Sequence, residues 1–110
     1  ILRADEVRQL TGRRYVFVCT GNTCRSPMAA AWMRRRIAQH LDCADAEIES
    51  YGYAIHSMGV AAMAGEPASA NAIATLAEAG VDLRRHRSSR LDREKLRSAH
   101  AVLAMGPQHL

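Results

Sequence analysis

VFVCTGNTCRSP, residues 16–27, joins an apolar run to a polar, glycine-containing loop through a cysteine. The apolar run is rich in β-branched and aromatic residues, which is typical of a buried parallel strand ending at Cys19. Ser26-Pro27 is suited to open a helix, because a proline at the first helical position needs no backbone N–H donor. The stretch therefore predicts a strand, a loop and a helix in direct succession, with a thiol at the end of the strand.

Strand and helix patterns alternate through the rest of the chain. Apolar residues at helical spacing continue from Pro27 to Leu41, and the three arginines at 34–36 are expected on the solvent side. The other expected elements are a linker at 42–46, a strand around 54–60, a helix over 67–79 stopped by Gly80, a short helix capped by Asp92, and a buried strand at 101–105. This order predicts one α/β domain, with a parallel sheet built by right-handed crossovers and helices on both faces.

Composition narrows the class of protein. The 110 residues suffice for one modest core, and the 48% hydrophobic content is ordinary for a globular protein. No apolar run approaches the length of a membrane span, and the sequence carries no secretory signal pattern. The three cysteines, Cys19, Cys24 and Cys43, make no disulfide framework. We therefore expect a cytoplasmic protein without a membrane partner.

The positive charge is mostly arginine. The formal net charge is +4 and the sequence pI is near 9.4, with clusters that include RRHRSSR at residues 84–90. Such charge could attract nucleic acid, and it equally suits an anionic substrate. Because no aromatic residues interleave with the clusters, we expect a solvated basic face and no nucleic-acid partner.

The loop after Cys19 has the chemistry of an anion site. Ligands of parallel α/β sheets bind at the carboxyl ends of strands, and free N–H groups at a helix start favour an anion there. Gly21 permits close approach of the backbone, Asn22 tolerates a left-handed conformation, and Arg25 offers a planar fork for two phosphoryl oxygens. Positive surroundings should also populate the thiolate of Cys19. The segment predicts a nucleophile inside a phosphate cradle.

The same residues resemble a known family. VFVCTGNTCRSPMA is similar to the active-site segment of the low-molecular-weight protein tyrosine phosphatases. The similarity continues through SMGV, PASANAIATLAEAGVDLRRHRSSRL and VLAM, covering roughly residues 13–108. The resemblance implies the fold of that family, a phosphorylated protein as substrate, and phosphate-like anions as ligands, with no metal and no cofactor.

Residue roles follow from this resemblance. Cys19 would attack phosphorus and form a phosphocysteine intermediate, and Ser26 would help the thiolate to leave. Asn22 and His86 would support the loop. Cys24 would pair reversibly with Cys19 under oxidation, or simply fill space. The residues expected to hold the phosphoryl group are Thr20, Gly21, Asn22, Thr23, Cys24 and Arg25.

The general acid of the family, an aspartate in an Asp-Pro pair, has no counterpart in these residues. The last strand and last helix of the family would also follow Leu110. We therefore expect residues 13–110 to be a C-terminally incomplete phosphatase domain from an active enzyme. An acid-lacking phosphate-binding module is the alternative from another class.

Thr23 bears on the substrate. Tyrosine-specific members commonly carry isoleucine or valine there, whereas CTGNTCRSP resembles the protein-arginine phosphatase branch. A hydroxyl suits a polar guanidinium better than a phenyl ring. Phosphoarginine is expected ahead of phosphotyrosine. Thiol-linked arsenate reductase is a weaker alternative, because no cysteine follows Cys43.

Residues 1–12 belong to no part of the phosphatase pattern. ILRADEV resembles the closing segment of the Sua5/YrdC threonylcarbamoyl-adenylate synthase family. We expect this segment to be a linker or the tail of a preceding domain. The sequence does not predict an oligomeric state.

Overall fold

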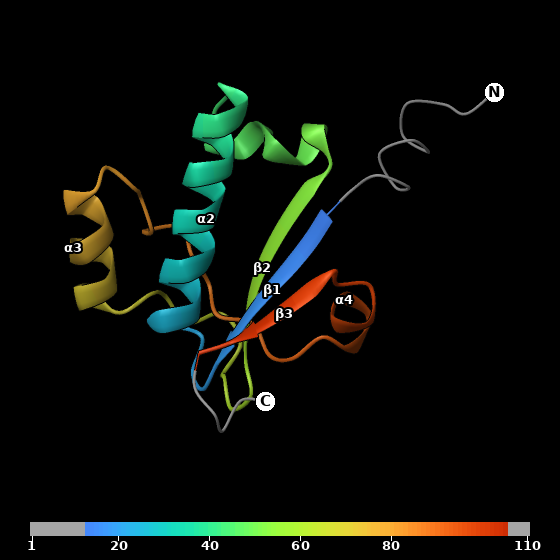
Figure 1. The fold of residues 1–110 in the computed structure, drawn as a ribbon. Helices are drawn as coiled ribbons and strands as arrows, with labels where there is room; N and C mark the ends of the chain where they lie inside the picture. Colours follow the sequence, from blue (N-terminus) through green and yellow to red (C-terminus); the bar gives the residue numbers. More distant parts are fainter. Residues whose placement is uncertain (1–12, 106–110) are drawn as a thin grey trace.

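Three parallel strands form the sheet of this protein, whose computed structural model describes residues 13–105 (Figure 1). The strands are β1 (Arg13–Cys19), β2 (Tyr53–Gly59) and β3 (Ala101–Ala104), in the order β2-β1-β3. The register pairs Cys19 with Gly59, so β1 and β2 end side by side. The predicted parallel α/β sheet is confirmed. Residues 1–12, expected to form a linker or tail, lie outside the described residues.

The helices begin and end close to their sequence signals. The helix α2 (Arg25–Leu41) starts two residues before Pro27, α3 (Ala70–Glu78) is capped by the Ser69 hydroxyl, and α4 (Arg93–Arg97) is capped by the Asp92 carboxylate. The predicted linker at 42–46 is partly wrong. A 3₁₀ helix, η1 (Asp45–Tyr51), already begins within it.

Alternation along β1 divides the core between the two faces of the sheet. On one face, Phe17 packs with buried residues of α2 and η1. On the other face, Val16 and Val18 pack with Leu96 of α4 and with Ala99, which follows that helix. The predicted placement of helices on both faces is therefore confirmed. The remaining helix, α3, packs against α2 rather than the sheet, as Figure 1 shows.

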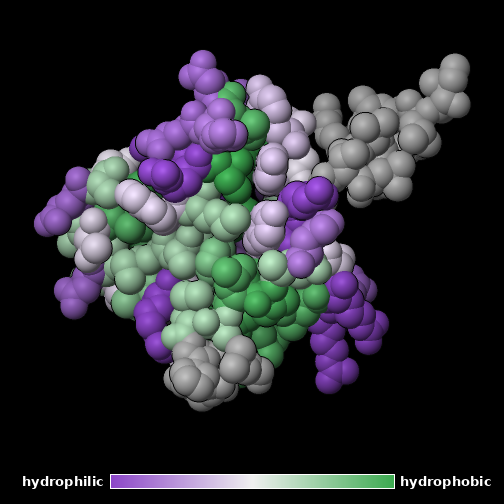
Figure 2. All heavy atoms as spheres, in the orientation of Figure 1, coloured by the Kyte–Doolittle hydropathy of each residue, from purple (hydrophilic) through white to green (hydrophobic). Residues whose placement is uncertain are grey.

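The strand β3 is not the buried strand that its sequence predicts. Val102 is 50% exposed and Leu103 is 37% exposed, and Figure 2 shows hydrophobic surface gathered in this region. Within the described sheet β3 is an edge strand that pairs only with β1. An apolar run shows that a strand can be buried, but it does not show whether another strand or helix packs over its side chains.

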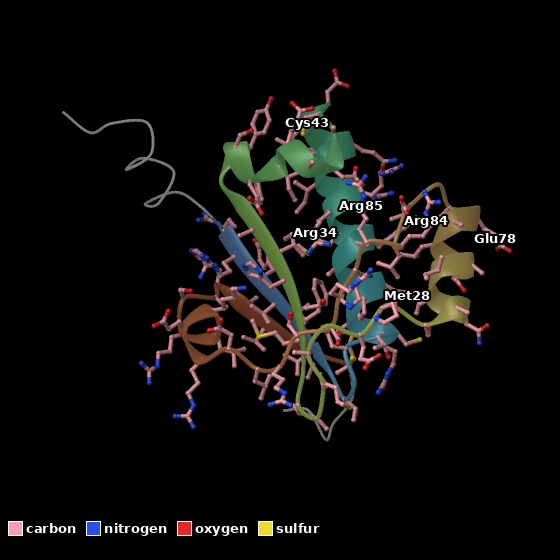
Figure 3. All side chains as sticks on the ribbon, turned by 180° about the vertical axis from the view of Figure 1, so that it is seen from behind. Met28, Arg34, Cys43, Glu78, Arg84 and Arg85 are labelled. Atoms are coloured by element: carbon pink, nitrogen blue, oxygen red, sulfur yellow. The ribbon has the colours of Figure 1, made fainter. Side chains whose placement is uncertain are left out.

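Two of the three arginines at 34–36 are not on the solvent side. Arg34 points from α2 toward β2, where its guanidinium donates to the carbonyl of Ile55 at 2.7 Å (Figure 3). Burial is the main cause that lowers the pKa of Arg34, against the opposing charges of Glu49 and Asp45. The helical periodicity predicts only the direction in which each Cβ points. It does not predict that a long arginine side chain extends back to the carbonyl of a neighbouring segment.

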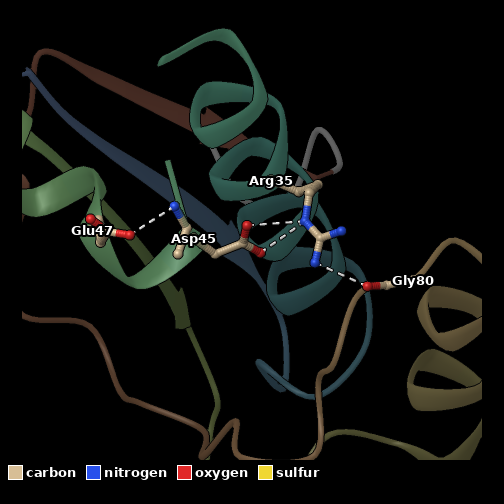
Figure 4. Close-up of polar contacts among 5 residues, drawn as sticks. Arg35, Asp45, Glu47 and Gly80 are labelled. Carbon is tan, nitrogen blue, oxygen red and sulfur yellow. Dashed lines mark hydrogen bonds and ion pairs between the residues drawn. The ribbon is translucent and has the colours of Figure 1, made fainter. Parts of the chain in front are cut away.

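Arg35 joins three segments of the fold. Its Nε donates to both carboxylate oxygens of Asp45, at 3.0 and 3.1 Å, and its Nη2 donates to the carbonyl of Gly80 at 3.0 Å (Figure 4). The contact links α2 to η1 and to the turn after α3.

None of the helices within residues 13–105 combines the length and apolarity that crossing a bilayer requires.

Candidate active site

Cys19 ends β1, and residues 20–24 lead directly into α2. The thiol is 3% exposed. The Sγ atom lies 2.9 Å from the Oγ atom of Ser26 and accepts the backbone N–H of Asn22 at 3.2 Å. The nucleophile predicted from the sequence therefore lies at the carboxyl edge of the sheet, held by groups of its own loop and of the following helix.

Asn22 organises these contacts. Its backbone is left-handed, with φ of 57°, as its residue type allows, and it is fully buried. The backbone N–H of Ser89 donates to Asn22 Oδ1 at 2.7 Å, which fixes the orientation of the amide. Asn22 Nδ2 then donates to Ser26 Oγ at 2.9 Å.

That chain of donors leaves the Ser26 hydroxyl proton available to Cys19. Since Ser26 Oγ already accepts a hydrogen bond from Asn22, its own proton is free to point at Cys19 Sγ. When Cys19 is a thiolate, which can only accept, the hydroxyl and the backbone amide both donate toward the sulfur. These are the partners that a sulfur carrying negative charge needs.

His86 holds the opposite side of Asn22. Its Nε2 lies 2.7 Å from the carbonyl oxygen of Asn22. Because a carbonyl can only accept, Nε2 carries the proton. Burial is the main cause that lowers the pKa of His86; the Asn22 carbonyl raises it, and the charges of Arg34 and Arg87 lower it further. His86 therefore acts as a neutral donor near pH 7.

Residues just after the end of β2 hold the Cys19 loop by backbone hydrogen bonds. Val60 N–H donates to the carbonyl of Cys19 and Ala61 N–H to that of Thr20, both at 2.9 Å. This approach needs Gly59, because a Cβ there would lie 2.6 Å from the Thr20 carbonyl oxygen and 3.0 Å from Asn22 N. Sequence reasoning missed Gly59 and Ser89. The glycine at the end of a predicted strand, in SMGV, was the available signal for Gly59. Ser89 acts through its backbone N–H, which its residue type does not reveal.

The other residues expected to hold the phosphoryl group differ in exposure and in contacts. Thr23 is half-buried, its carbonyl accepts the N–H of Ser69 at 2.7 Å, and its Oγ1 lies 3.7 Å from the position that a Cβ on Gly21 would take. Cys24 precedes α2 and packs against the core cluster between α2 and α3. Thr20 is exposed. Cys19 and Cys24 are both free thiols, so the redox role of Cys24 stays a prediction.

Arg25 is exposed, and its Nη1 donates to the carbonyl of Met105, just after β3, at 2.9 Å. The guanidinium thus lies beside the carboxyl edge of the sheet and keeps further N–H donors. The described contacts do not join Arg25 to Cys19.

Cys43 and Asp82 take no part in this set of contacts. Cys43 lies at the far end of α2 from the loop, about 25 Å of helix away (Figure 3). Its pKa is raised by burial and by Glu47, Asp45 and Asp42. Asp82 pairs with Arg84, which lowers the pKa of the carboxyl to about 2. Within residues 13–105, no group of three or more His, Cys, Asp or Glu side chains could hold a metal ion.

Comparison with known proteins gives one consistent result. The family described as low molecular weight phosphotyrosine protein phosphatase matches residues 14–110. A protein-arginine-phosphatase of Geobacillus stearothermophilus is 42% identical over 87% of this chain and 56% of its own length. A probable low molecular weight protein-tyrosine-phosphatase, EpsP, of Ralstonia solanacearum is 34% identical over 81% of this chain and 52% of its own.

Solved structures agree with the sequence matches. The YwlE arginine phosphatase, in a mutant with a phosphorylated active site serine, superposes with a TM-score of 0.71. It is 38% identical, and the match covers 87% of this chain and 57% of that one. The chain thus spans about half the length of the curated relatives it matches.

Proposed function

Because the chain belongs to the low molecular weight phosphotyrosine protein phosphatase family, we propose that residues 13–110 carry a cysteine-dependent protein phosphatase activity with Cys19 as the nucleophile. The supporting observation is the buried, hydrogen-bonded set of Cys19, Ser26 and Asn22.

In the first step the Cys19 sulfur attacks phosphorus, an S–P bond forms, and the bond to the leaving group breaks. The loop amides and the free donors of Arg25 hold the phosphoryl oxygens, where negative charge concentrates in the transition state. In the second step water attacks phosphorus, the S–P bond breaks, and phosphate leaves. The Ser26 hydroxyl donates to the sulfur as it departs with its electron pair.

We propose phosphoarginine in proteins as the preferred substrate, with phosphotyrosine as the second candidate. Identity to the Geobacillus protein-arginine-phosphatase supports the first, and identity to the probable tyrosine phosphatase keeps the second open. Thr23 supports phosphoarginine physically, because its hydroxyl oxygen can accept from guanidinium N–H groups that lose water in the pocket.

The nucleophile is tested by Cys19→Ser, with Cys43→Ser as the matched control. A serine hydroxyl is a far weaker nucleophile than a thiolate, so Cys19→Ser should abolish turnover of an aryl phosphate and of a phosphoarginine peptide. Cys43→Ser should retain it. Near-normal turnover by Cys19→Ser would refute the mechanism. Binding of vanadate without turnover by the unmodified protein would instead identify a phosphate-binding module.

The substrate is tested by kcat/KM for phosphoarginine and phosphotyrosine peptides on three proteins. Thr23→Val removes the hydroxyl at similar shape, and Thr23→Ile adds bulk as well. One lost polar contact is worth about 1–3 kcal/mol, so each variant should move the ratio toward phosphotyrosine by roughly one to two decades. An unchanged ratio would remove Thr23 as the determinant, and a preference of the unmodified protein for phosphotyrosine would overturn the substrate assignment.

A further inference from the structure

A polar cavity opens at the outer edge of β2, away from the Cys19 loop. Its volume is about 230 Å³. The walls come from β2, from the segment 86–92, from α4 and from Arg34 of α2. None of residues 19–25 lines it. It is therefore a separate cavity, although it borders the same segment that holds Asn22.

The charge of this cavity is strongly unbalanced. Four cationic side chains line it, and its one carboxylate, that of Asp92, accepts the backbone N–H groups of Glu94 and Lys95. The ion pairs among the described residues join Arg35 to Asp45 and Arg84 to Asp82. The cations of the cavity, which take part in neither pair, are Arg34, Arg87, Arg90 and Lys95.

Backbone carbonyls, rather than carboxylates, hold the three guanidinium groups. Arg34 donates to Ile55 at 2.7 Å, Arg87 to His86 at 2.8 Å, and Arg90 to Ala62 at 3.2 Å. A neutral carbonyl orients a guanidinium without cancelling its charge, and each guanidinium has five N–H donors. The side chains are thus positioned and keep donors for another acceptor.

His56 adds an unpartnered polar atom to the same wall. Its Nε2 is buried and makes no hydrogen bond among the described residues. Burial lowers the pKa of His56, and the positive charges of Lys95, Arg14 and Arg34 lower it further against Glu49. A buried polar atom without a partner costs free energy. His56 also lines the cavity, and in the tautomer that carries the proton on Nε2 this atom would donate to an acceptor that reached it.

We propose that this cavity is a second oxyanion site, which binds a phosphate or phosphoryl group independently of Cys19. Its volume is large enough for such a group, and bidentate guanidinium donors match the oxygens of a phosphoryl group. Two of its wall residues, His86 and Ser89, also hold Asn22 through its carbonyl and its side chain. Each of these two residues is therefore connected to the Cys19 sulfur by two hydrogen bonds, both through Asn22.

The test is a titration of ¹⁵N-labelled protein with inorganic phosphate, followed residue by residue by NMR. The Cys19→Ser background prevents turnover and leaves the cavity intact. Amides of His56, Ser57 and Ser89 should shift with a saturation curve of their own, distinct from the amides of Gly21 and Thr23. The His56 ring should titrate at higher pH with phosphate present, because an anion favours the imidazolium among Lys95, Arg14, Arg34 and Glu49.

Charge-matched variants separate the cavity from general surface charge. The double variant Arg87→Ala with Lys95→Ala should weaken phosphate binding at His56 about tenfold or more, which corresponds to about 1.4 kcal/mol. Arg93→Ala with Arg97→Ala removes the same charge from exposed positions of α4 outside the cavity and should leave the curve within about twofold. Arg87→Gln with Lys95→Gln repeats the first test at similar side-chain length.

A second arm identifies the source of the anion. A phosphoserine peptide that shifts the His56 amide at lower concentration than inorganic phosphate would assign the cavity to a phosphoryl group on a protein. The reverse order would assign it to free phosphate. Absence of saturable shifts at His56 with both probes, or equal weakening by the two double variants, would overturn the site. Neither result would bear on catalysis by Cys19, which is measured separately.

Discussion

Asn22 combines a left-handed backbone with a side chain that is bonded at both ends. The amide accepts from Ser89 and donates to Ser26, and the backbone N–H donates to the Cys19 sulfur. The left-handed conformation aims this N–H at the sulfur while the side chain turns into the core. The backbone and side-chain contributions can be separated by substitution.

We predict that Asn22→Ala is less stable than Asn22→Gly by about 1 kcal/mol. Both lose the side-chain hydrogen bonds, which should lower the free energy of unfolding by about 1–3 kcal/mol. Alanine also carries a left-handed penalty of about 1–2 kcal/mol, partly offset by the greater chain entropy of glycine. Urea denaturation measures all three proteins. Equal stabilities would contradict a left-handed backbone at this position.

Much of the site was predictable at this level because the chemistry is local in sequence. Cys19, Asn22 and Ser26 lie within one stretch, and the left-handed turn follows from the residue type. His86 was predictable only by resemblance, since nothing near it in sequence shows that its ring meets a carbonyl 64 positions away. Ser89 was not predictable, because any residue with a backbone N–H could make its contact.

Helix boundaries were predictable where one local residue, such as a capping side chain, defines them. The burial of an element was less predictable, because it depends on which other elements pack against it. Asp92 caps its helix as expected, whereas the helix expected from residue 67 begins at Ala70 behind a Ser69 cap that the sequence did not predict. The exposure of β3 and the inward course of Arg34 depend on what lies beside each element, which periodicity does not encode. The close approach of β2 to the Cys19 loop also depends on two elements that are distant in sequence, and it requires the absence of a side chain at Gly59.

We predict that Gly59→Ala lowers both stability and phosphatase activity. The added Cβ would lie 2.6 Å from the Thr20 carbonyl oxygen and 2.7 Å from the Ala62 Cβ, so the loop must move. Overpacking of this kind costs about 1–3 kcal/mol. Activity and urea denaturation are measured together.

Gly65→Ala is the matched control for this change. No atom lies within 4 Å of the added Cβ, but φ is +87°, so the cost is backbone strain alone. It should lower stability by about 1–2 kcal/mol and leave kcat/KM unchanged. If Gly59→Ala behaved in the same way, the close approach to the loop would have no role in catalysis.

At the level of the entire fold, two half-buried histidines couple stability to pH. The pKa of His56 and that of His86 both lie below the usual 6.5, chiefly because of burial. The unfolded chain therefore binds these protons more tightly than the folded one. Their contribution to stability is complete above pH 6.5 and is lost as the pH falls toward the folded-state pKa values.

We predict that the free energy of unfolding falls as the pH is lowered below about 6.5, because the unfolded chain then binds the protons of these histidines more tightly than the folded chain. Each can contribute a slope of at most about 1.4 kcal/mol per pH unit. His86→Gln keeps an N–H donor for the Asn22 carbonyl but cannot titrate, so its pH dependence should be shallower. Urea denaturation across the pH series measures both proteins. A steeper dependence in the variant would contradict the assignment.

The Ser89–Asn22 hydrogen bond also sets when the site can exist during folding. It spans 67 positions, so a chain that has formed β1 and α2 has its thiol and its helix but lacks the bond that orients the amide. Closing so long a loop becomes favourable only together with much of the core. We therefore predict that the complete Cys19 site forms late in folding, and that amide exchange at Ser89 reports its formation.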